Sequence, residues 1–211
     1  MPHSLPIAVL VSGSGTNLQA LIEASDGANS SYEIVAVVAD RPDAGGLFRA
    51  QSAGIPTDVV LWEDHDDRTS FSAAICDAAQ GRGAAVLVLA GFMRILASVA
   101  IERFPDAIVN VHPALLPAFP GADAVEQSLA YGVTVTGVTV HFVDEKVDHG
   151  PIIAQEAVEI EHLDDAASLH ARIQAVEHRL LPEVVTALAR GEIKVHGREV
   201  QWLKSPGSGP R

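Results

Sequence analysis

The chain has 211 residues, of which 48% are hydrophobic, and this supplies enough apolar surface for one substantial core. Its formal net charge of −13 argues against a surface built for nucleic acid or an anionic membrane, because such partners are bound by patches of Lys and Arg. An anionic substrate must therefore meet a local positive site.

Cysteine content and apolar runs limit the compartment and the domain organisation. The single cysteine, Cys76, excludes an intramolecular disulfide framework, and its apolar surroundings predict a small buried side chain. The first six residues do not read as a signal peptide, and no apolar run approaches the roughly 20 residues that span a bilayer. We therefore expect a cytoplasmic protein with one domain over residues 1–204 and a disordered Gly- and Pro-containing tail over 205–211.

Short apolar runs alternate with stretches of helical spacing along most of the chain. The predicted strands are 7–11, 34–39, 57–61, 85–90, 107–111, 134–143 and 152–160. The predicted helices are one that carries Leu18, Leu21 and Ile22, and four over 46–53, 68–79, 122–130 and 166–189. Alternation of this kind implies an α/β fold whose parallel sheet is covered by helices on both faces.

The turn after the first strand, Ser12-Gly13-Ser14-Gly15-Thr16-Asn17, can bind phosphate. Backbone N–H groups and the helix dipole face outward at such a position. The turn lacks the third glycine of a dinucleotide fingerprint and the lysine of a P-loop. The alternative is a tight turn in which Thr16 or Asn17 caps the helix.

Asn110 and His112 end a predicted strand, where open α/β sheets bind their ligands. Strand alternation places both on the same side of the sheet. Together an amide and an imidazole can hold a carbonyl and stabilise an oxyanion, and the imidazole can also move a proton. The alternative is a histidine that only hydrogen-bonds at the strand end.

A charged loop, Asp144 to Pro151, connects two predicted strands. If Asp148 lies close to His112, its charge raises the pKa of the imidazole and favours an imidazolium. The alternative is a solvated turn. His141 and His149 lack the paired spacing of a metal site, and we therefore expect no metal.

Four motifs occur in an order that resembles the phosphoribosylglycinamide formyltransferase family, with the similarity running from about residue 7 to about residue 203. They are Val11-Ser12-Gly13-Ser14-Gly15-Thr16-Asn17-Leu18-Gln19-Ala20, Leu89-Ala90-Gly91-Phe92-Met93-Arg94-Ile95-Leu96, Asn110-Val111-His112-Pro113-Ala114-Leu115-Leu116-Pro117, and Val140-His141-Phe142-Val143 running to Asp148-His149-Gly150-Pro151. Four ordered motifs are much more specific than any one of them alone.

The resemblance implies a three-layer α/β/α sandwich with a mixed, mostly parallel, seven-stranded Rossmann-like sheet. Its first part would bind the phosphoribosyl substrate and its later part the folate. Gly15, Thr16 and Asn17 would hold the phosphate, while Gln174 and Glu177 would contact the ribose hydroxyls and the glycinamide. The folate site would comprise Arg68, Met93, Arg94, Ile95, Leu96, Asn110, Asp144 and Asp148.

The implied activity is transfer of a formyl group from 10-formyltetrahydrofolate to the amine of 5'-phosphoribosylglycinamide in purine synthesis. Asn110, His112 and Asp148 would be catalytic. Asn110 and protonated His112 would stabilise the oxyanion, and Asp148 would sustain the protonation. The expected partners are small molecules, with no nucleic acid, membrane or metal, and the protein would be a monomer or a homodimer.

Rival activities share parts of this pattern. A formyltetrahydrofolate hydrolase would be expected to carry a preceding regulatory domain, and a methionyl-tRNA formyltransferase a C-terminal RNA-binding extension. A catalytically silent folate- or nucleotide-binding protein on the same fold is the alternative outside enzymes. Ala118 and Val125 stand where many relatives carry other residues, which leaves substrate preference partly open.

Overall fold

The computed structural model describes residues 4–26 and 30–203, and the tail predicted over 205–211 lies outside them. Its strands are β1 (Leu5–Val11), β2 (Tyr32–Ala39), β3 (Thr57–Val59), β4 (Val86–Leu89), β5 (Ile108–His112), β6 (Val135–Phe142), β7 (Ile152–Glu159), β8 (Ile193–His196) and β9 (Glu199–Trp202). The helices are α1 (Thr16–Ser25), α2 (Gly45–Ser52), α3 (Arg68–Gly81), α4 (Ser98–Arg103), α5 (Ala124–Tyr131) and α6 (Ala166–Ala189), with a 3-10 turn η1 (Trp62–Asp64).

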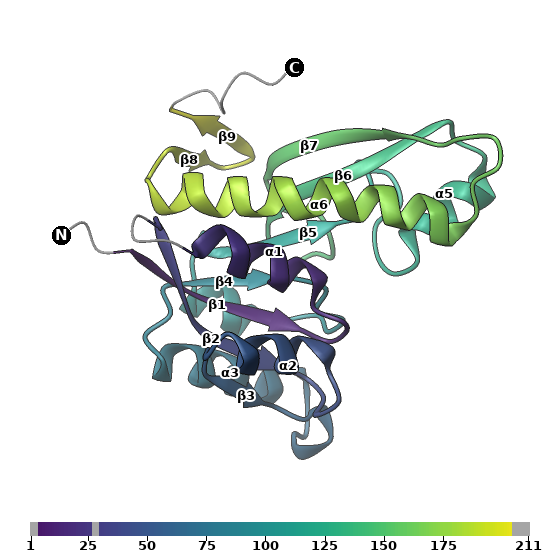
Figure 1. The fold of residues 1–211 in the computed structure, drawn as a ribbon. Coiled ribbons are helices and arrows are strands. Elements are labelled where there is room, and N and C mark those ends of the chain that lie inside the picture. The colour runs from purple at the N-terminus through teal and green to yellow at the C-terminus, as the bar shows by residue number, and fades with distance from the viewer. Residues whose placement is uncertain (1–3, 27–29, 204–211) are drawn as a thin grey trace.

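Seven of these strands form one sheet in the order β3-β2-β1-β4-β5-β6-β7 (Figure 1). β6 runs antiparallel to both of its neighbours, whereas the other neighbouring strands pair in parallel. The predicted α/β fold with a mixed, mostly parallel sheet is therefore confirmed.

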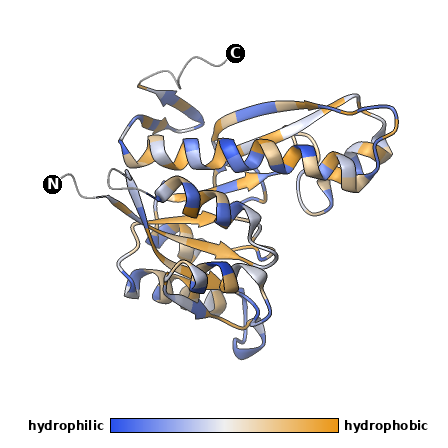
Figure 2. Ribbon diagram, viewed as in Figure 1, coloured by the Kyte–Doolittle hydropathy of each residue, from blue (hydrophilic) through white to orange (hydrophobic). Residues whose placement is uncertain are grey.

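The sheet is buried on both faces, which explains why its central strands are apolar along their whole length. In β1, Ile7, Val9 and Val11 pack into a cluster with α1, α2, α5 and α6, whereas Ala8 and Leu10 pack with α3 and α4 on the other face. Each fully buried aliphatic side chain contributes about 1.5–3 kcal/mol relative to an exposed one. Figure 2 shows the apolar residues concentrated in the strands and on the sheet-facing sides of the helices.

Helices α3 and α6 begin at capping boxes, which satisfy backbone groups at the first turn. Asp67 accepts a hydrogen bond from the N–H of Ser70, and Asp165 accepts one from the N–H of Ser168. The matching side-chain bonds back to Asp67 and Asp165 are also present. These caps explain why both helices begin at the residues that the sequence pattern predicts.

Three features were not predicted: the 3-10 turn η1, the short helix α4 and the β8–β9 hairpin. Six residues are too few to show helical spacing, and the hairpin strands have only four residues each. The hairpin docks on the sheet through Trp202, whose indole N–H donates to the carbonyl of Ile153 at 2.9 Å. Cys76 is fully buried, as predicted.

The residues predicted to form the functional site lie near the carboxyl ends of the parallel strands. Asn110 pairs with Leu89 of β4 on one side and with His141 of β6 on the other. Within the described residues, no helix combines the length and hydropathy needed to cross a membrane.

Candidate active site

His112 lies at the end of β5 and is only 4% exposed. Its Nδ1 is 3.4 Å from a carboxylate oxygen of Asp148, so the predicted proximity of these two side chains is found. Its Nε2 lies 2.8 Å from the carbonyl oxygen of Phe119. Because a carbonyl oxygen can only accept, Nε2 carries a proton.

Burial and the charge of Asp148 act in opposite directions on the pKa of His112. Burial lowers the pKa of His112, and this effect exceeds the increase caused by the charge of Asp148 and by the Phe119 carbonyl. Asp148 does favour the imidazolium, as expected, but it does not compensate for the loss of water around the ring.

Asp148 sits in the loop between β6 and β7 with a positive φ of 50°. Burial raises the pKa of Asp148, but hydrogen bonds from His141 and from the Gly121 N–H, with the neighbouring imidazoles, outweigh burial and lower it overall. The Gly121 N–H donates to Asp148 at 2.7 Å. The carboxylate is thus ionised although its side chain is only 11% exposed.

Asn110 joins the same cluster through its amide nitrogen. Nδ2 lies 3.2 Å from Nε2 of His141 and donates to Asp148 over 3.4 Å. His141 Nδ1 lies 2.7 Å from the carbonyl of Phe142, and its Nε2 lies 3.7 Å from Asp148. The bond from Asn110 to Asp148 is long at 3.4 Å, so this amide hydrogen is easily released to a ligand.

The turn predicted to bind phosphate has an uncapped helix end. Gly15 is the N-cap of α1 with a φ of 72°, and no side chain caps that end. Thr16 and Asn17 lie inside the helix, so the alternative in which one of them is the N-cap is wrong. A Cβ on Gly15 would lie 2.5 Å from Cα of Gly46, and only glycine fits this approach.

Asn17 and Glu177 meet although 160 positions separate them in the sequence. Nδ2 of Asn17 donates to Glu177 at 2.9 Å, while Oδ1 of Asn17 is buried without a hydrogen-bond partner. Burial raises the pKa of Glu177, although the bond from Asn17 opposes this. Gln174 lies one turn earlier on α6 and is half-buried.

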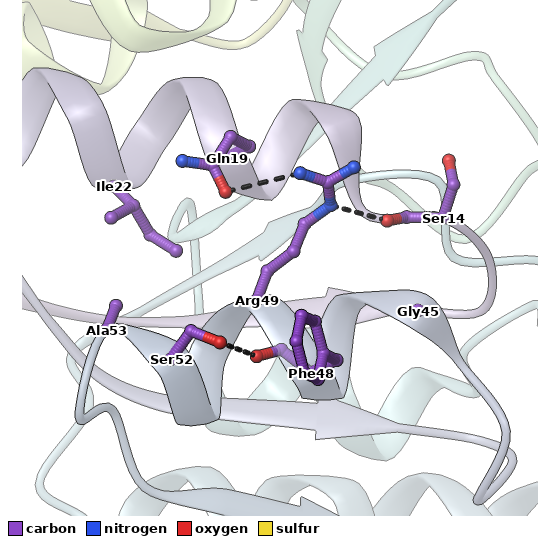
Figure 3. A pocket seen from close by; sticks show the side chains of 8 residues that line it. All are labelled: Ser14, Gln19, Ile22, Gly45, Phe48, Arg49, Ser52 and Ala53. Atoms are coloured by element: carbon purple, nitrogen blue, oxygen red, sulfur yellow. Dashed lines mark hydrogen bonds between the residues drawn. The ribbon is translucent and has the colours of Figure 1, made fainter.

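A cavity of about 600 Å³ opens between α1 and α2, beside the Gly15 turn (Figure 3). Arg49 reaches across it, donating through Nε to the carbonyl of Ser14 at 2.8 Å and through Nη1 to Gln19 at 3.3 Å. Both acceptors are uncharged, so this guanidinium keeps its charge available for an anion. The cavity is lined by Ser14, Gln19, Ile22, Gly45, Phe48, Arg49, Ser52 and Ala53.

Apart from Asn110 and Asp148, which lie in the His112 cluster, the residues predicted to bind folate lie in three places. Met93 and Ile95 are 68% and 51% exposed on the segment after β4, whereas Leu96 is buried in the core. Arg68 is exposed at the start of α3, and within the described residues no hydrogen bond or ion pair joins it to the His112 cluster. Asp144 accepts hydrogen bonds from the Lys146 N–H and from His149.

Sequence reasoning missed the positions of Arg49 and His141. His141 was considered only as a metal ligand, yet it lies directly across from Asn110 in the antiparallel β5–β6 pair. The pairing of His141 with Asn110 would have placed His141 in the site if the reversed direction of β6 had been foreseen. Arg49 had no local signal. Within residues 4–26 and 30–203, no group of three or more His, Cys, Asp or Glu side chains is arranged to hold a metal ion.

Comparison with known proteins identifies the family. A family model described as formyl transferase matches residues 5–185. A phosphoribosylglycinamide formyltransferase from Mycobacterium tuberculosis is 43% identical over 200 residues, which cover 94% of this chain and 92% of that protein. The crystal structure of glycinamide ribonucleotide transformylase 1 from Symbiobacterium toebii superposes with a TM-score of 0.94 at 42% identity, covering 97% of this chain and 96% of that one.

A human relative is longer. The trifunctional purine biosynthetic protein adenosine-3 of Homo sapiens is 41% identical over 94% of this chain. This chain spans only 20% of the length of that human protein. The family and the fold predicted from the four motifs are both confirmed by these similarities. The chain belongs to the formyl transferase family.

Proposed function

We propose that the protein transfers the formyl group of 10-formyltetrahydrofolate to the amine of 5'-phosphoribosylglycinamide, giving formylglycinamide ribonucleotide and tetrahydrofolate in purine biosynthesis. The observation that carries this proposal is the cluster at the end of β5, in which ionised Asp148 contacts both His112 and Asn110. The names of the full-length relatives support the same reaction.

The cluster suits a reaction in which negative charge develops on one oxygen. The amine nitrogen attacks the formyl carbon, forming a C–N bond while the carbonyl electrons move to the oxygen. A hydrogen of Asn110 and the Nε2–H of His112 would stabilise that oxyanion. Since Nε2–H donates to Phe119 in the structure, it must leave that carbonyl to reach the substrate.

His112 would take a proton from solvent before the attack and act on the oxyanion as an imidazolium. Burial disfavours that form, whereas the developing oxyanion together with Asp148 would favour it. The attacking amine passes its proton to an ordered water, and that water passes a proton to the folate nitrogen as the bond from the formyl carbon to that nitrogen breaks. His112 keeps its proton, so the transfer itself is balanced.

The acceptor's phosphate would bind at the Gly15 turn. The uncapped N-terminus of α1, with the N–H groups of Thr16 and Asn17, offers donors and a favourable dipole. Arg49 supplies the local positive charge that a chain of net charge −13 requires. Glu177 and Gln174 would hold the ribose and the glycinamide, with the unpartnered Oδ1 of Asn17 as a further acceptor.

The formyl donor would lie against the segment after β4. Exposed Met93 and Ile95 offer apolar surface to a flat ring, and Asn110 lies at the adjacent strand end. Arg68 and the loop from Asp144 to Asp148 would complete this side. The donor is a folate in this proposal, and no metal takes part.

The direct test is a formyl-transfer assay with purified protein, 10-formyltetrahydrofolate and phosphoribosylglycinamide, followed by folate absorbance. We expect product only when the amine is present. Loss of the formyl group without the amine would indicate the hydrolase instead. No reaction despite folate binding would indicate the silent binding protein or a different acceptor, and either result would overturn the proposal.

A further inference from the structure

A buried carboxylate outside the proposed catalytic cluster, Asp40, lies just after β2. Its side chain is 0% exposed, and Oδ2 accepts from Nε of Arg94 at 2.8 Å. The second oxygen, Oδ1, is buried without a hydrogen-bond partner and lies 3.7 Å from Nε of Arg41. A buried carboxylate is costly unless paired, so its position depends on Arg94.

Arg94 is the middle residue of the segment after β4, and its side chain is held from two sides. Asp40 binds its Nε, and the ring of Trp62 lies beneath the guanidinium at 5.6 Å. Trp62 in turn packs edge-on against buried Phe71 at 5.2 Å. The guanidinium is therefore ion-paired through Nε and lies over the indole ring, with 37% of its side chain still exposed.

The same segment is tied to the turn after β1 at one end and to α3 at the other. The Ser12 N–H donates to the carbonyl of Gly91 at 3.0 Å, and the Met93 N–H donates to the Ser12 hydroxyl at 2.8 Å. Farther along, the Ala97 N–H donates to the Ser72 hydroxyl at 2.9 Å. Between Met93 and Ala97, the described side chain that holds the segment is Arg94, through its hydrogen bond to Asp40.

Fixing Arg94 inward determines how its neighbours are presented. Met93 and Ile95 flank it and are 68% and 51% exposed, so they offer apolar surface on this segment. If Arg94 were released, these two side chains could turn toward the protein instead.

We propose that Asp40 is a positioning residue for the formyl donor: through its ion pair with Arg94 it holds Met93 and Ile95 in the exposed arrangement that receives the folate ring. This inference rests on the proposed function only for the identity of the donor. Asp40 touches no reacting atom, and its role is to place the surface that does.

The test compares Asp40→Asn with the wild-type protein. Asparagine keeps the size and one acceptor oxygen but removes the charge, so we expect the dissociation constant for tetrahydrofolate, measured by calorimetry, to rise about tenfold. KM for the formyl donor should rise similarly, while kcat and KM for the amine substrate change less than about twofold, within the range of a weak effect. The matched control is Asp58→Asn, which breaks an ion pair with Arg82 of 3.2 Å elsewhere in the same half, and it should change none of these values.

A double-mutant cycle shows whether Asp40 acts through Arg94. In an Arg94→Gln background, Asp40→Asn should produce no further loss of tetrahydrofolate affinity, because the pair is already broken. Additive losses would overturn the inference, as would equal rises in both KM values or an Asp40→Asn variant with wild-type affinity. If Asp40→Asn does not fold, the paired variant Asp40→Leu with Arg94→Met removes both charges. It should fold yet bind tetrahydrofolate weakly, and wild-type affinity in that variant would overturn the proposal.

The two hypotheses fail separately in this design. A wild-type protein that binds tetrahydrofolate but transfers no formyl group would contradict the proposed function, while the binding comparison would still decide the role of Asp40. A wild-type protein that transfers the formyl group, with Asp40→Asn indistinguishable from it, would contradict only the inference about Asp40.

Discussion

Asp148 and Glu177 are both carboxyl groups held away from water, but their pKa values move in opposite directions. Burial raises both pKa values. At Asp148, the lowering of the pKa by His112, His141 and the Gly121 N–H together exceeds the raising by burial. At Glu177, the hydrogen bond from Asn17 does not offset the raising by burial. The difference shows that the number of donors around a carboxylate, rather than burial alone, decides its charge.

The two regions are therefore suited to different tasks. The end of β5 keeps a negative charge beside an imidazole and can respond to charge that develops during a reaction. The contact between α1 and α6 places a buried carboxyl group, whose pKa is raised, beside an amide, and this pair suits hydrogen bonding to hydroxyl and amide groups. Changes in the first region should affect turnover, and changes in the second should affect binding of the acceptor.

The largest effect is expected from Asp148→Asn. The variant removes the charge that favours imidazolium at His112, so kcat should fall by about 10²- to 10⁴-fold, the usual range for a lost acid–base partner. KM for the amine substrate should change little, because Glu177 and the Gly15 turn are unaffected. Steady-state kinetics measure both values. A variant with normal kcat and a raised KM would show that Asp148 binds substrate and does not support turnover.

Gly15→Ala tests whether the acceptor region depends on backbone shape. The new Cβ meets Gly46 at 2.5 Å at a φ of 72°, and we expect a loss of stability above the roughly 1–2 kcal/mol of a positive φ alone. Gly83→Ala is the matched control, since Gly83 has a φ of 82° with nothing within 4 Å of the added Cβ. Thermal or urea unfolding measures the difference. Equal losses in both variants would contradict the importance of the Gly46 contact.

Arg49→Gln tests the local positive site. Loss of the charge should raise KM for the phosphorylated amine by about tenfold with kcat nearly unchanged, because a charge-assisted bond to phosphate is lost. Arg190→Gln serves as control, since Arg190 donates to the hydroxyl of Ser31 at 2.9 Å and lies at the end of α6. A competition assay with inorganic phosphate should show the same loss. Unchanged KM in Arg49→Gln would place the phosphate elsewhere.

The smallest effect is a pH dependence of stability. The folded-state pKa of Glu177 is raised above its ordinary value of 4.5, so its contribution is present below that value and is lost as pH rises through the folded pKa. Glu177→Gln should therefore compare more favourably with wild type at pH 7 than at pH 4. Asp148→Asn should show the opposite trend, because the contribution of Asp148 is present above its ordinary pKa of 3.8 and is lost as pH falls. Urea unfolding at both pH values measures this, and parallel trends would contradict the comparison.

Much of this architecture follows from local pattern. Apolar runs such as 7–11 predict buried strands, and the Asp165 cap lies immediately before the helix predicted to begin at 166. The reversed direction of β6 could not be derived from spacing, because strand pattern carries no direction. The family resemblance implied only that the sheet is mixed and did not say which strand is reversed.

The site was predictable where its residues stand in motifs. Asn110, His112 and Asp148 were named in advance, and the structure brings them together. The contributions of Arg49 and Asp40 were not foreseen, because each depends on partners 35 and 54 positions away in the sequence. Asp148 raises the pKa of His112 as predicted, but the larger lowering by burial was not foreseen, since burial is a property of the folded chain and not of its sequence.

The most direct test of the central claim is to measure kcat, together with the dissociation constants for tetrahydrofolate and phosphoribosylglycinamide, in His112→Ala. We predict that turnover falls by about 10²- to 10⁴-fold while both ligands bind with nearly wild-type affinity, because His112 acts on the reacting oxygen rather than on the bound ends of the substrates. Wild-type turnover in this variant, or a matching loss of affinity for both ligands, would contradict the account.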